Sequence, residues 1–332
     1  MMKPIPISLA VLVFTLLTNF AQAQNAINYT FTAFDVPFAG GSNTKAFDIT
    51  PGGDIVGRFF DANFGGNPRG FLRYRDGSFA PPIDVPVPNT GTVARGVDSG
   101  GDMVGKWFDL SGGTHGFFRS AGGGFLLFDV PLPGAIAGTT IANSLSNNGV
   151  IVGEYTAPTS ISICPVPVPL PHGFVRNADG SFTAIDVPGA VATSARGVDD
   201  SGNIVGAYVT IPASTTTCSP SAIINVHGFV RDAQGNYTTL DFPGATNTLL
   251  FRIADSGDIT GLYTAAVVTS EILSDNIPPN SPVISFVSFR NGTFTSLNIP
   301  YPDSSTRGIN PQGDVVGVYT DVHGDHGFLG SR

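Results

Sequence analysis

The chain of 332 residues has few charged side chains and no cluster of basic ones. Charged residues make up 12% of the sequence, and 16 Lys and Arg stand against 25 Asp and Glu, a formal net charge of −9. A protein that binds a phosphate backbone concentrates positive charge on one surface. The acidic balance, without any run of Lys or Arg, therefore excludes nucleic acid as an expected partner.

Long apolar runs are also missing, except at the N-terminus. Residues 1–23 read MMKPIPISLAVLVFTLLTNFAQA, with one lysine, an apolar run and a small-x-small cleavage signal. These are the parts of a secretory signal peptide. A spanning helix needs about 20 apolar residues, and no later segment supplies them. We therefore expect a signal peptide at 1–23 and a mature chain 24–332 that forms one domain, has no transmembrane segment and is secreted to the periplasm or the extracellular space.

Abundant residue types recur in three short signatures, each present six times. The first ends in the glycine of DIVG-like segments, and these glycines lie 48 to 56 residues apart: Gly57, Gly105, Gly153, Gly206, Gly261 and Gly317. The second is Asp-apolar-Pro, at Asp35, Asp84, Asp129, Asp186 and Asp241, with Asn298 in the remaining copy. The third is HGF, at His115, His172, His227 and His326, with Arg69 and Ile284 in place of histidine. A period near 50 residues indicates a repeat architecture.

Each unit contains four short apolar runs separated by turn signals such as DDSG and NADG. Runs this short and this rich in Val, Ile, Phe and Tyr are typical of strands. Four strands in about 50 residues is the size of a propeller blade. We therefore predict an all-β, six-bladed β-propeller with four antiparallel strands per blade. The expected blades are residues 45–86, 93–131, 141–188, 194–243, 249–300, and 305–332 joined by 31–37.

The two ends of the chain predict how this ring closes. Residues 31–37 read FTAFDVP, which is a fourth strand without the first three, and the last unit has three strands without a fourth. Pairing the two ends completes a blade and removes both free edges. The sequence thus predicts that an N-terminal strand within 31–37 joins the last blade.

The repeated unit resembles the HAF-repeat family of predicted extracellular repeat proteins. That family combines a strand of small residues, an Asn/Asp-x-x-Gly turn, an apolar-Val-Gly strand and a His-small-Phe strand, and here the last reads HGF. The resemblance covers about residues 31–332. It implies an extracellular propeller and carries no defined activity.

Repetition separates structural residues from functional candidates. A reaction centre occurs once in a molecule, whereas a residue needed for blade geometry occurs in every blade. The HGF histidines, the Asp-apolar-Pro aspartates and the turn glycines are therefore interpreted as structural, with each polar group paired inside its blade.

Side chains that break the repeat are the candidates for binding. The position after the signature glycine is charged only in the first three units, as Arg58, Lys106 and Glu154. Ten residues before the glycine, arginine falls in the second, fourth and sixth units, as Arg95, Arg196 and Arg307. These arginines either pair with neighbouring aspartates or form a cationic ring that holds one anion. Glu154 is either an ion-pair partner of a neighbouring cation or a general acid.

No sequence motif assigns a reaction. Nucleophile elbows, H-E-x-x-H, Walker loops and dinucleotide fingerprints are all missing. If the protein is an enzyme, its candidate catalytic residues are Glu154, Glu271 and Asp275. The polar segment at Asp321, His323 and Asp325 offers candidate metal ligands, although a polar turn explains it equally. We expect no cofactor and no resident metal.

The expected function is binding rather than catalysis. The connections between the second and third strands are long in three adjacent units, over residues 156–171, 209–226 and 264–284. Loops on one face of a rigid scaffold commonly carry function. We expect a monomer that binds a glycan or another extracellular partner through this face. An enzyme acting on a polysaccharide, and a structural envelope or matrix protein, are the alternatives.

The only two cysteines, Cys164 and Cys218, lie in two of these connections. Each follows the aromatic residue of its second strand by nine or ten positions, so they occupy nearly equivalent places in neighbouring blades. Secreted proteins meet an oxidising environment. The sequence therefore predicts a Cys164–Cys218 disulfide between blades three and four.

Overall fold

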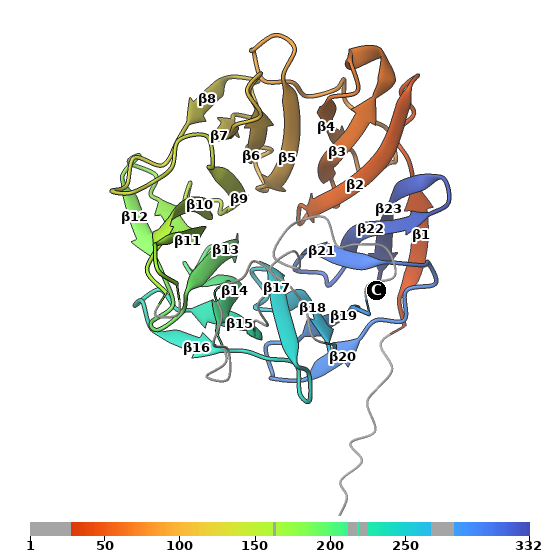
Figure 1. Ribbon diagram of the computed structural model, residues 1–332. Coiled ribbons are helices and arrows are strands. Elements are labelled where there is room, and N and C mark those ends of the chain that lie inside the picture. The colour runs from red at the N-terminus through yellow and green to blue at the C-terminus, as the bar shows by residue number, and fades with distance from the viewer. Residues whose placement is uncertain (1–27, 162–163, 212–217, 219–224, 267–281) are drawn as a thin grey trace, which may run out of the picture.

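The computed structural model describes residues 28–161, 164–211, 218, 225–266 and 282–332, and shows six antiparallel sheets arranged around a central axis (Figure 1). Blade one contains β2 (Gly41–Ile49), β3 (Ile55–Asp61) and β4 (Pro68–Arg73). Blade two contains β5 (Gly91–Val97), β6 (Met103–Phe108), β7 (Thr114–Arg119) and β8 (Phe125–Phe128). Blade three contains β9 (Ile141–Leu145), β10 (Ile151–Thr159), β11 (Val168–Arg176) and β12 (Phe182–Ile185).

The other three blades repeat this order. Blade four contains β13 (Ala192–Val198), β14 (Ile204–Thr210), β15 (Asn225–Arg231) and β16 (Tyr237–Thr239). Blade five contains β17 (Asn247–Ile253), β18 (Ile259–Thr264), β19 (Ile284–Ser288) and β20 (Phe294–Ser296). Blade six contains β21 (Ser305–Ile309), β22 (Val315–Asp321), β23 (Gly324–Ser331) and β1 (Thr30–Phe34). The predicted six-bladed β-propeller is confirmed.

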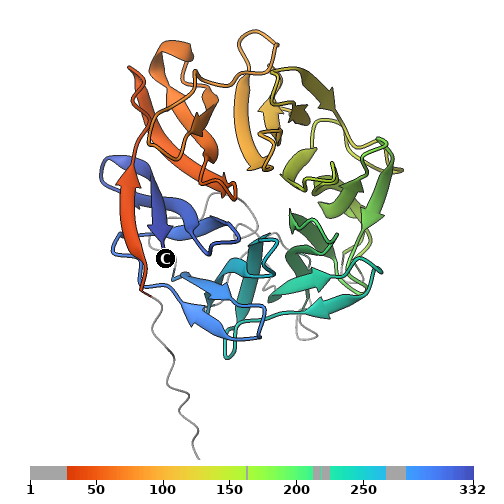
Figure 2. The ribbon, with the colours of Figure 1, turned by 180° about the vertical axis from the view of Figure 1, so that it is seen from behind.

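The first strand of every blade lines the axis, as the view from behind also shows (Figure 2). We call the side with the turns between first and second strands the turn face. The opposite side carries the connections between second and third strands and the crossovers between blades, and we call it the loop face. In the described part of the chain the only helix is a 3-10 turn at Ala62–Phe64, and no helix is long and apolar enough to cross a membrane.

Strand β1 closes the ring as the sequence predicts. It pairs with β23 along five residue pairs, from Thr30 with Ser331 to Phe34 with Gly327. Phe31 packs edge-on against Phe328, with ring centroids 5.8 Å apart. The first and last segments of the chain therefore share one blade, in which β23 is paired on both sides and β1 is the outermost strand.

Blade one departs from the pattern at its outer edge. Its fourth strand is reduced to isolated bridges that pair Phe79 with Arg73 and Ile83 with Gly70. Pro81 and Pro82 lie between the two bridges. Because proline has no N–H to donate, a regular ladder cannot run through these positions.

The repeated glycine and phenylalanine account for the packing inside each blade. The HGF phenylalanine is completely or almost completely buried in every blade: Phe71, Phe117, Phe174, Phe229, Phe286 and Phe328. Its ring covers the signature glycine of the adjacent strand. A Cβ built on Gly206 would lie 2.0 Å from Ser194 O and 2.8 Å from Phe229 Cε1. Glycine therefore recurs in every unit because no larger residue fits at this position.

Replacing Gly206 by alanine should destabilise the protein by about 3 kcal/mol, because the contact with Ser194 O is with backbone and cannot be relieved by a rotamer change. Gly52→Ala is the matched control, since its Cβ would meet only Thr50 Oγ1 at 3.5 Å. Urea unfolding of both variants measures the difference. Equal midpoints for the two would show that the glycine repeat has another cause.

The long connections are shorter than the sequence predicts in blade three. Strands β10 and β11 stay paired as far as Thr159 with Val168, so residues 160–167 alone connect them. The predicted loop over 156–171 is therefore wrong in extent, because Thr156 and Ala157 continue the ladder and Pro169 and Pro171 lie within β11. Much of the other two connections, at 212–217, 219–224 and 267–281, lies outside the described residues.

Candidate functional site: the channel and the loop face

Each innermost strand carries a β-bulge at the same position. The register between first and second strands skips one residue in every blade. The skipped residues are Phe47, Arg95, Asn143, Arg196, Phe251 and Arg307, and all six are buried. A bulge re-aims its side chain relative to the sheet. Side-chain contacts join Phe47, Arg95 and Asn143 in one group and Arg196, Phe251 and Arg307 in another. Because the six residues occupy the same position in their blades, we call them together the bulge layer.

The three predicted arginines lie in this layer and pack on aromatic rings. Arg95 lies 5.3 Å from the ring centroid of Phe47, and Arg196 and Arg307 lie 5.1 and 4.4 Å from that of Phe251. Arg95 Nε also donates to Asn143 Oδ1 at 2.8 Å. Such cation–π contacts separate like charges that would otherwise face each other. The threefold placement of arginine is thus a feature of the channel interior.

Arg252 is a central residue that the sequence analysis missed. It follows the bulge in β17, is 6% exposed, and crosses the axis to reach other blades. Its Nη1 donates to Arg196 O and Phe251 O, and its Nη2 donates to Arg95 O at 2.5 Å and Asn143 O at 2.7 Å. Blade five is therefore tied to blades two, three and four through one guanidinium.

Asp48 of blade one completes this contact. Its Oδ1 lies 3.2 Å from Arg252 Nε, and its Oδ2 accepts a hydrogen bond from Val97 N at 3.2 Å. Burial raises the pKa of the Asp48 carboxyl, against the opposing influence of Arg252. A signal for this pair was present in the repeat. The residue after the bulge is glycine in blades two and four and serine in blade three. It is charged only in blades one and five, as Asp48 and Arg252, which have opposite signs.

The glycines that follow the bulge allow neighbouring blades to approach. A Cβ on Gly197 would lie 2.9 Å from Arg252 Cα, and one on Gly308 would lie 2.9 Å from Asp48 Cα. Gly96 stands in the same relation to Ser144 Cα, at 3.0 Å. The inner strands therefore approach each other closely in the pairs two and three, four and five, and six and one.

Toward the loop face, blades one and six share a largely buried cluster of opposite charges. Lys45 Nζ lies 3.1 Å from Asp325 Oδ2, and Arg58 Nη2 lies 3.6 Å from the same oxygen. Arg58 Nη1 also donates to Asn43 O at 3.0 Å. Burial lowers the pKa of Lys45, and the adjacent Arg58 lowers it further. The structure thus joins one predicted binding residue, Arg58, to a lysine that the sequence analysis did not select.

Lys106 and Glu154 occupy the positions equivalent to Arg58 in blades two and three. Lys106 Nζ lies 5.3 Å from the ring centroid of Phe108. Glu154 Oε2 is buried and makes no hydrogen bond within the described part of the chain. The other two candidate catalytic residues, Glu271 and Asp275, lie outside the described residues.

Only two of the three candidate metal ligands of blade six lie together, because His323 Nδ1 is 3.5 Å from Asp321 Oδ1 while Asp325 has other partners. Asp325 faces Lys45 and Arg58 and accepts from Thr320 Oγ1 at 2.8 Å. Asp321 Oδ1 accepts from His323 N at 2.7 Å, and the His323 side chain is 79% exposed. Among the residues that the structure describes, no group of three His, Cys, Asp or Glu side chains could hold a metal ion. Asp325 is therefore part of the ionic cluster, and Asp321 stabilises a turn.

The repeated histidines pair with the repeated aspartates of the same blade. The Nδ1-to-carboxylate distances are 2.9 Å for His115–Asp129, 3.0 Å for His172–Asp186, 2.8 Å for His227–Asp241 and 2.8 Å for His326–Asp35. In blade one Arg69 replaces histidine and binds Asp84 through two nitrogens. In blade five both partners change together, to Ile284 and Asn298. This joint change inside one chain supports a structural role for the pair.

Two of these histidines have altered acidity. Partial burial lowers the pKa of His115, but hydrogen bonds with Asp129 and Asp109 outweigh it and raise the pKa above its ordinary value. His326, held between Asp35 and Asp321, has its pKa raised in the same way. Each imidazole is thus held by two carboxylates near the loop face.

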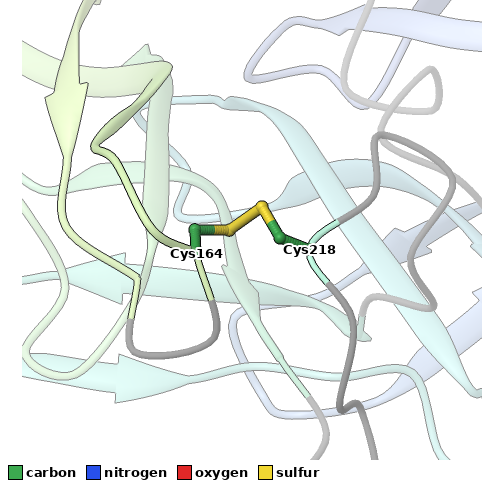
Figure 3. Close-up of a disulfide and its surroundings, with 2 residues drawn as sticks. All are labelled: Cys164 and Cys218. Carbon is green, nitrogen blue, oxygen red and sulfur yellow. A yellow bond between two sulfur atoms is a disulfide. The ribbon is translucent and has the colours of Figure 1, made fainter.

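The predicted disulfide is confirmed. Cys164 and Cys218 are bonded, with their Cα atoms 5.0 Å apart, and join the connections of blades three and four (Figure 3). The bond closes a sequence separation of 54 residues. It therefore ties together two neighbouring connections on the loop face.

Charge is distributed unevenly between the channel and the outer surface. The two inner strands of the blades carry seven basic residues: Lys45, Arg58, Arg95, Lys106, Arg196, Arg252 and Arg307. The same strands carry four acidic residues: Asp48, Asp61, Glu154 and Asp321. Because the whole chain has a net charge of −9, the strands around the axis are positive within an acidic protein.

Comparison with known proteins bears on the fold alone. No family model matches the chain, and no match is found among curated proteins. A solved streptogramin B lyase is 15% identical, with 91% of this chain and 97% of that one covered and a TM-score of 0.45. Virginiamycin B lyase from Staphylococcus aureus is 9% identical, with 91% and 99% covered and a TM-score of 0.47. The β-propeller domain of the Trilobed protease from Pyrococcus furiosus is 11% identical, with 88% and 82% covered and a TM-score of 0.44.

Proposed function

We propose that the protein is a secreted, non-catalytic propeller that binds an acidic glycan or a similar extracellular polyanion at the loop face. The observation that carries this proposal is the charge distribution: apart from the Asp48–Arg252 pair on the turn face, the inner strands carry six basic and three acidic residues in a chain with net charge −9, and the buried arginines among them act through their electric field. A surface above a predominantly basic set of residues attracts ligands of the opposite sign. Carboxylate and sulfate groups match arginine and lysine donors.

The disulfide supports the same face. It joins two neighbouring connections of the loop face, and bracing a binding loop lowers the entropy lost when a ligand binds. A disulfide also fits export to an oxidising compartment, as expected from the signal peptide. Membership of the HAF-repeat family agrees with this function and stays a prediction.

The proposal predicts that purified mature protein binds acidic polysaccharides and does not bind neutral ones of the same size. Lys106→Ala should weaken that binding about tenfold, which corresponds to the loss of one charge-assisted contact of about 1.4 kcal/mol. Raising the salt concentration should weaken it further, because the attraction is electrostatic. Glycan-array screening followed by calorimetry measures both effects.

Arg231→Ala is the matched control, since Arg231 lies on β15 against Tyr237, away from the inner strands. The control should bind as tightly as the unmodified protein. Equal affinity for neutral and acidic glycans, or equal loss in both variants, contradicts the proposal. Turnover of a polysaccharide that Glu154→Gln abolishes would establish the enzyme alternative instead.

A further inference from the structure

A second site lies at the other end of the channel, on the turn face. A cavity of about 50 Å³ opens there, and all six blades line it. Its walls come from the turns that link first and second strands, and its floor includes Asp48 and Arg252. A volume of this size holds a small polar group or a few waters. The cavity is thus separated from the loop face by the bulge layer.

The rim of this cavity is a directed chain of hydrogen bonds between turns. Ser99 N donates to Asn147 Oδ1 at 2.9 Å, Asn147 N donates to Asp200 Oδ1 at 2.8 Å, and Asp200 N donates to Asp255 Oδ1 at 2.9 Å. These residues occupy the same turn position in blades two to five. Blades six and one have Pro311 and Pro51 there, which offer neither an N–H nor a side-chain acceptor.

The rim is therefore divided into two arcs of different chemistry. The polar arc of blades two to five carries the carboxylates of Asp98, Asp200 and Asp255. The apolar arc consists of Pro51 and Pro311 at the rim, and below the rim every blade adds an apolar residue to the wall: Ile49, Val97, Leu145, Val198, Ile253 and Ile309. Such a division fits a molecule that is charged at one end and apolar along its stem.

The charged residues that line the cavity favour a cation as its ligand. Arg252 is the only basic residue among its lining residues, and its Nη atoms already donate to four carbonyl oxygens while Nε faces Asp48. Arg252 therefore has little capacity left to bind an anion. The carboxylates of Asp98, Asp200 and Asp255 face no other basic group in the lining.

The rim carboxylates keep acceptor capacity for a ligand. Asp98 Oδ1 accepts from Gly100 N and Asp102 N, with a further backbone hydrogen bond from Gly101 to this carboxylate, and Asp255 Oδ1 accepts from Asp200 N. Asp98 and Asp255 belong to blades two and five, which stand opposite each other in the ring. Burial raises the pKa of Asp98, so a cation placed beside it would be stabilised by a partly desolvated carboxylate.

We infer that this cavity binds an organic ammonium group on a short apolar stem, such as a lysine side chain or a small alkylamine. The described residues contain no group of three ligands close enough to hold a bare metal ion. An alkylammonium is larger, donates three hydrogen bonds and uses the apolar arc as well. The inference does not depend on the proposed glycan binding, which concerns the other face.

Calorimetric titration of the mature protein with n-butylammonium chloride tests the inference. We expect saturable binding of n-butylammonium and no binding of n-butanol, which has the same stem without the charge. Asp255→Asn should weaken the binding at least tenfold, because the amide keeps the rim acceptor for Asp200 N but loses the charge. Asp179→Asn is the matched control, since Asp179 is an exposed carboxylate that binds Ser181 in an outer turn.

Three results would overturn the inference. They are equal heats for n-butanol and n-butylammonium, equal affinity in the protein and its Asp255→Asn variant, and displacement of n-butylammonium by an equimolar amount of calcium. The last would assign the cavity to a metal ion. Acidic-glycan binding measured on Asp255→Asn should be unchanged, so failure here and failure of the proposed function are distinguishable.

Discussion

A chain that lacks residues 31–37 should lose its cooperative thermal transition or melt at least 10 °C below the complete protein. The deletion removes most of β1, which supplies the outer strand of blade six through five residue pairs with β23. It also removes two phenylalanines that pack in neighbouring clusters, Phe31 with Phe328 and Phe34 with Phe71. Burial of each ring contributes about 2 kcal/mol.

The exposed edge adds to this loss. Gly327 and Gly330 of β23 lie directly under Phe34 and Phe31, where a Cβ would meet the rings at 2.8 and 2.6 Å. Without the rings, a flat strand edge with no side chains at these positions faces solvent and promotes association between molecules. In a domain of this size each kcal/mol lost lowers the melting temperature by about 2–4 °C.

Thr32→Ala is the control for β1, since Thr32 is exposed and pairs through its backbone with Leu329. Its melting temperature should stay within about 1 °C of the unmodified protein. Calorimetry with light scattering follows unfolding and aggregation together. A truncated protein that stays soluble and melts normally would show that β1 does not close the ring.

The closure and the blade count could be predicted because they depend on residues that every blade needs. Gly206 and its five equivalents cannot be replaced without a clash against backbone. Glycine therefore recurs at this position in all six units, and its regular spacing can be recognised in the sequence. The disulfide could be predicted for the same reason, since equivalent positions in adjacent blades are neighbours. The residues that determine strand register and ring closure are thus the ones that could be predicted from the sequence.

The channel was predicted only in part, because its geometry depends on the bulges. A bulge residue such as Phe251, which has no partner in the strand register, changes which side chains face the axis. No local sequence pattern predicts where such a bulge occurs. The arginines were found from their spacing, but their aromatic partners were not. In blade three the predicted loop was too long because a ladder with a neighbouring strand can continue through Thr156 and Pro171, and strand propensity alone does not reveal that pairing.

Replacing Arg252 by methionine should destabilise the propeller by about 5 kcal/mol, the upper part of the range for breaking a buried ion pair from one side. The change leaves the Asp48 carboxylate buried, at 6% exposure, without its cation. It also removes the donors to carbonyl oxygens of blades two, three and four. Arg231→Met, which alters a cation on β15, the third strand of blade four, should change stability by less than about 1 kcal/mol.

A second substitution separates the two contributions. In the double variant Asp48→Asn with Arg252→Met no buried charge remains, so we expect it to recover part of the stability lost in Arg252→Met alone. Asp48→Asn by itself leaves the guanidinium buried but still bonded to the carbonyl oxygens, and its cost should be smaller than that of Arg252→Met. A double variant no more stable than Arg252→Met would show that the carbonyl contacts, rather than the ion pair, account for the whole effect.

The pH dependence of the Arg252→Met variant gives an independent test. Removing the guanidinium takes away an influence that lowers the pKa of Asp48, so in the variant this pKa rises further above its ordinary value. A carboxyl whose pKa is raised by folding stabilises the protein when it is protonated, and this contribution is lost as the pH rises through the folded-state pKa. The deficit of Arg252→Met relative to the unmodified protein should therefore be smaller at pH 4 than at pH 7.5, as measured by urea unfolding at both values. In the double variant, where asparagine cannot titrate, the deficit should vary less between these two pH values, and an equal variation in both variants would exclude Asp48 as its source.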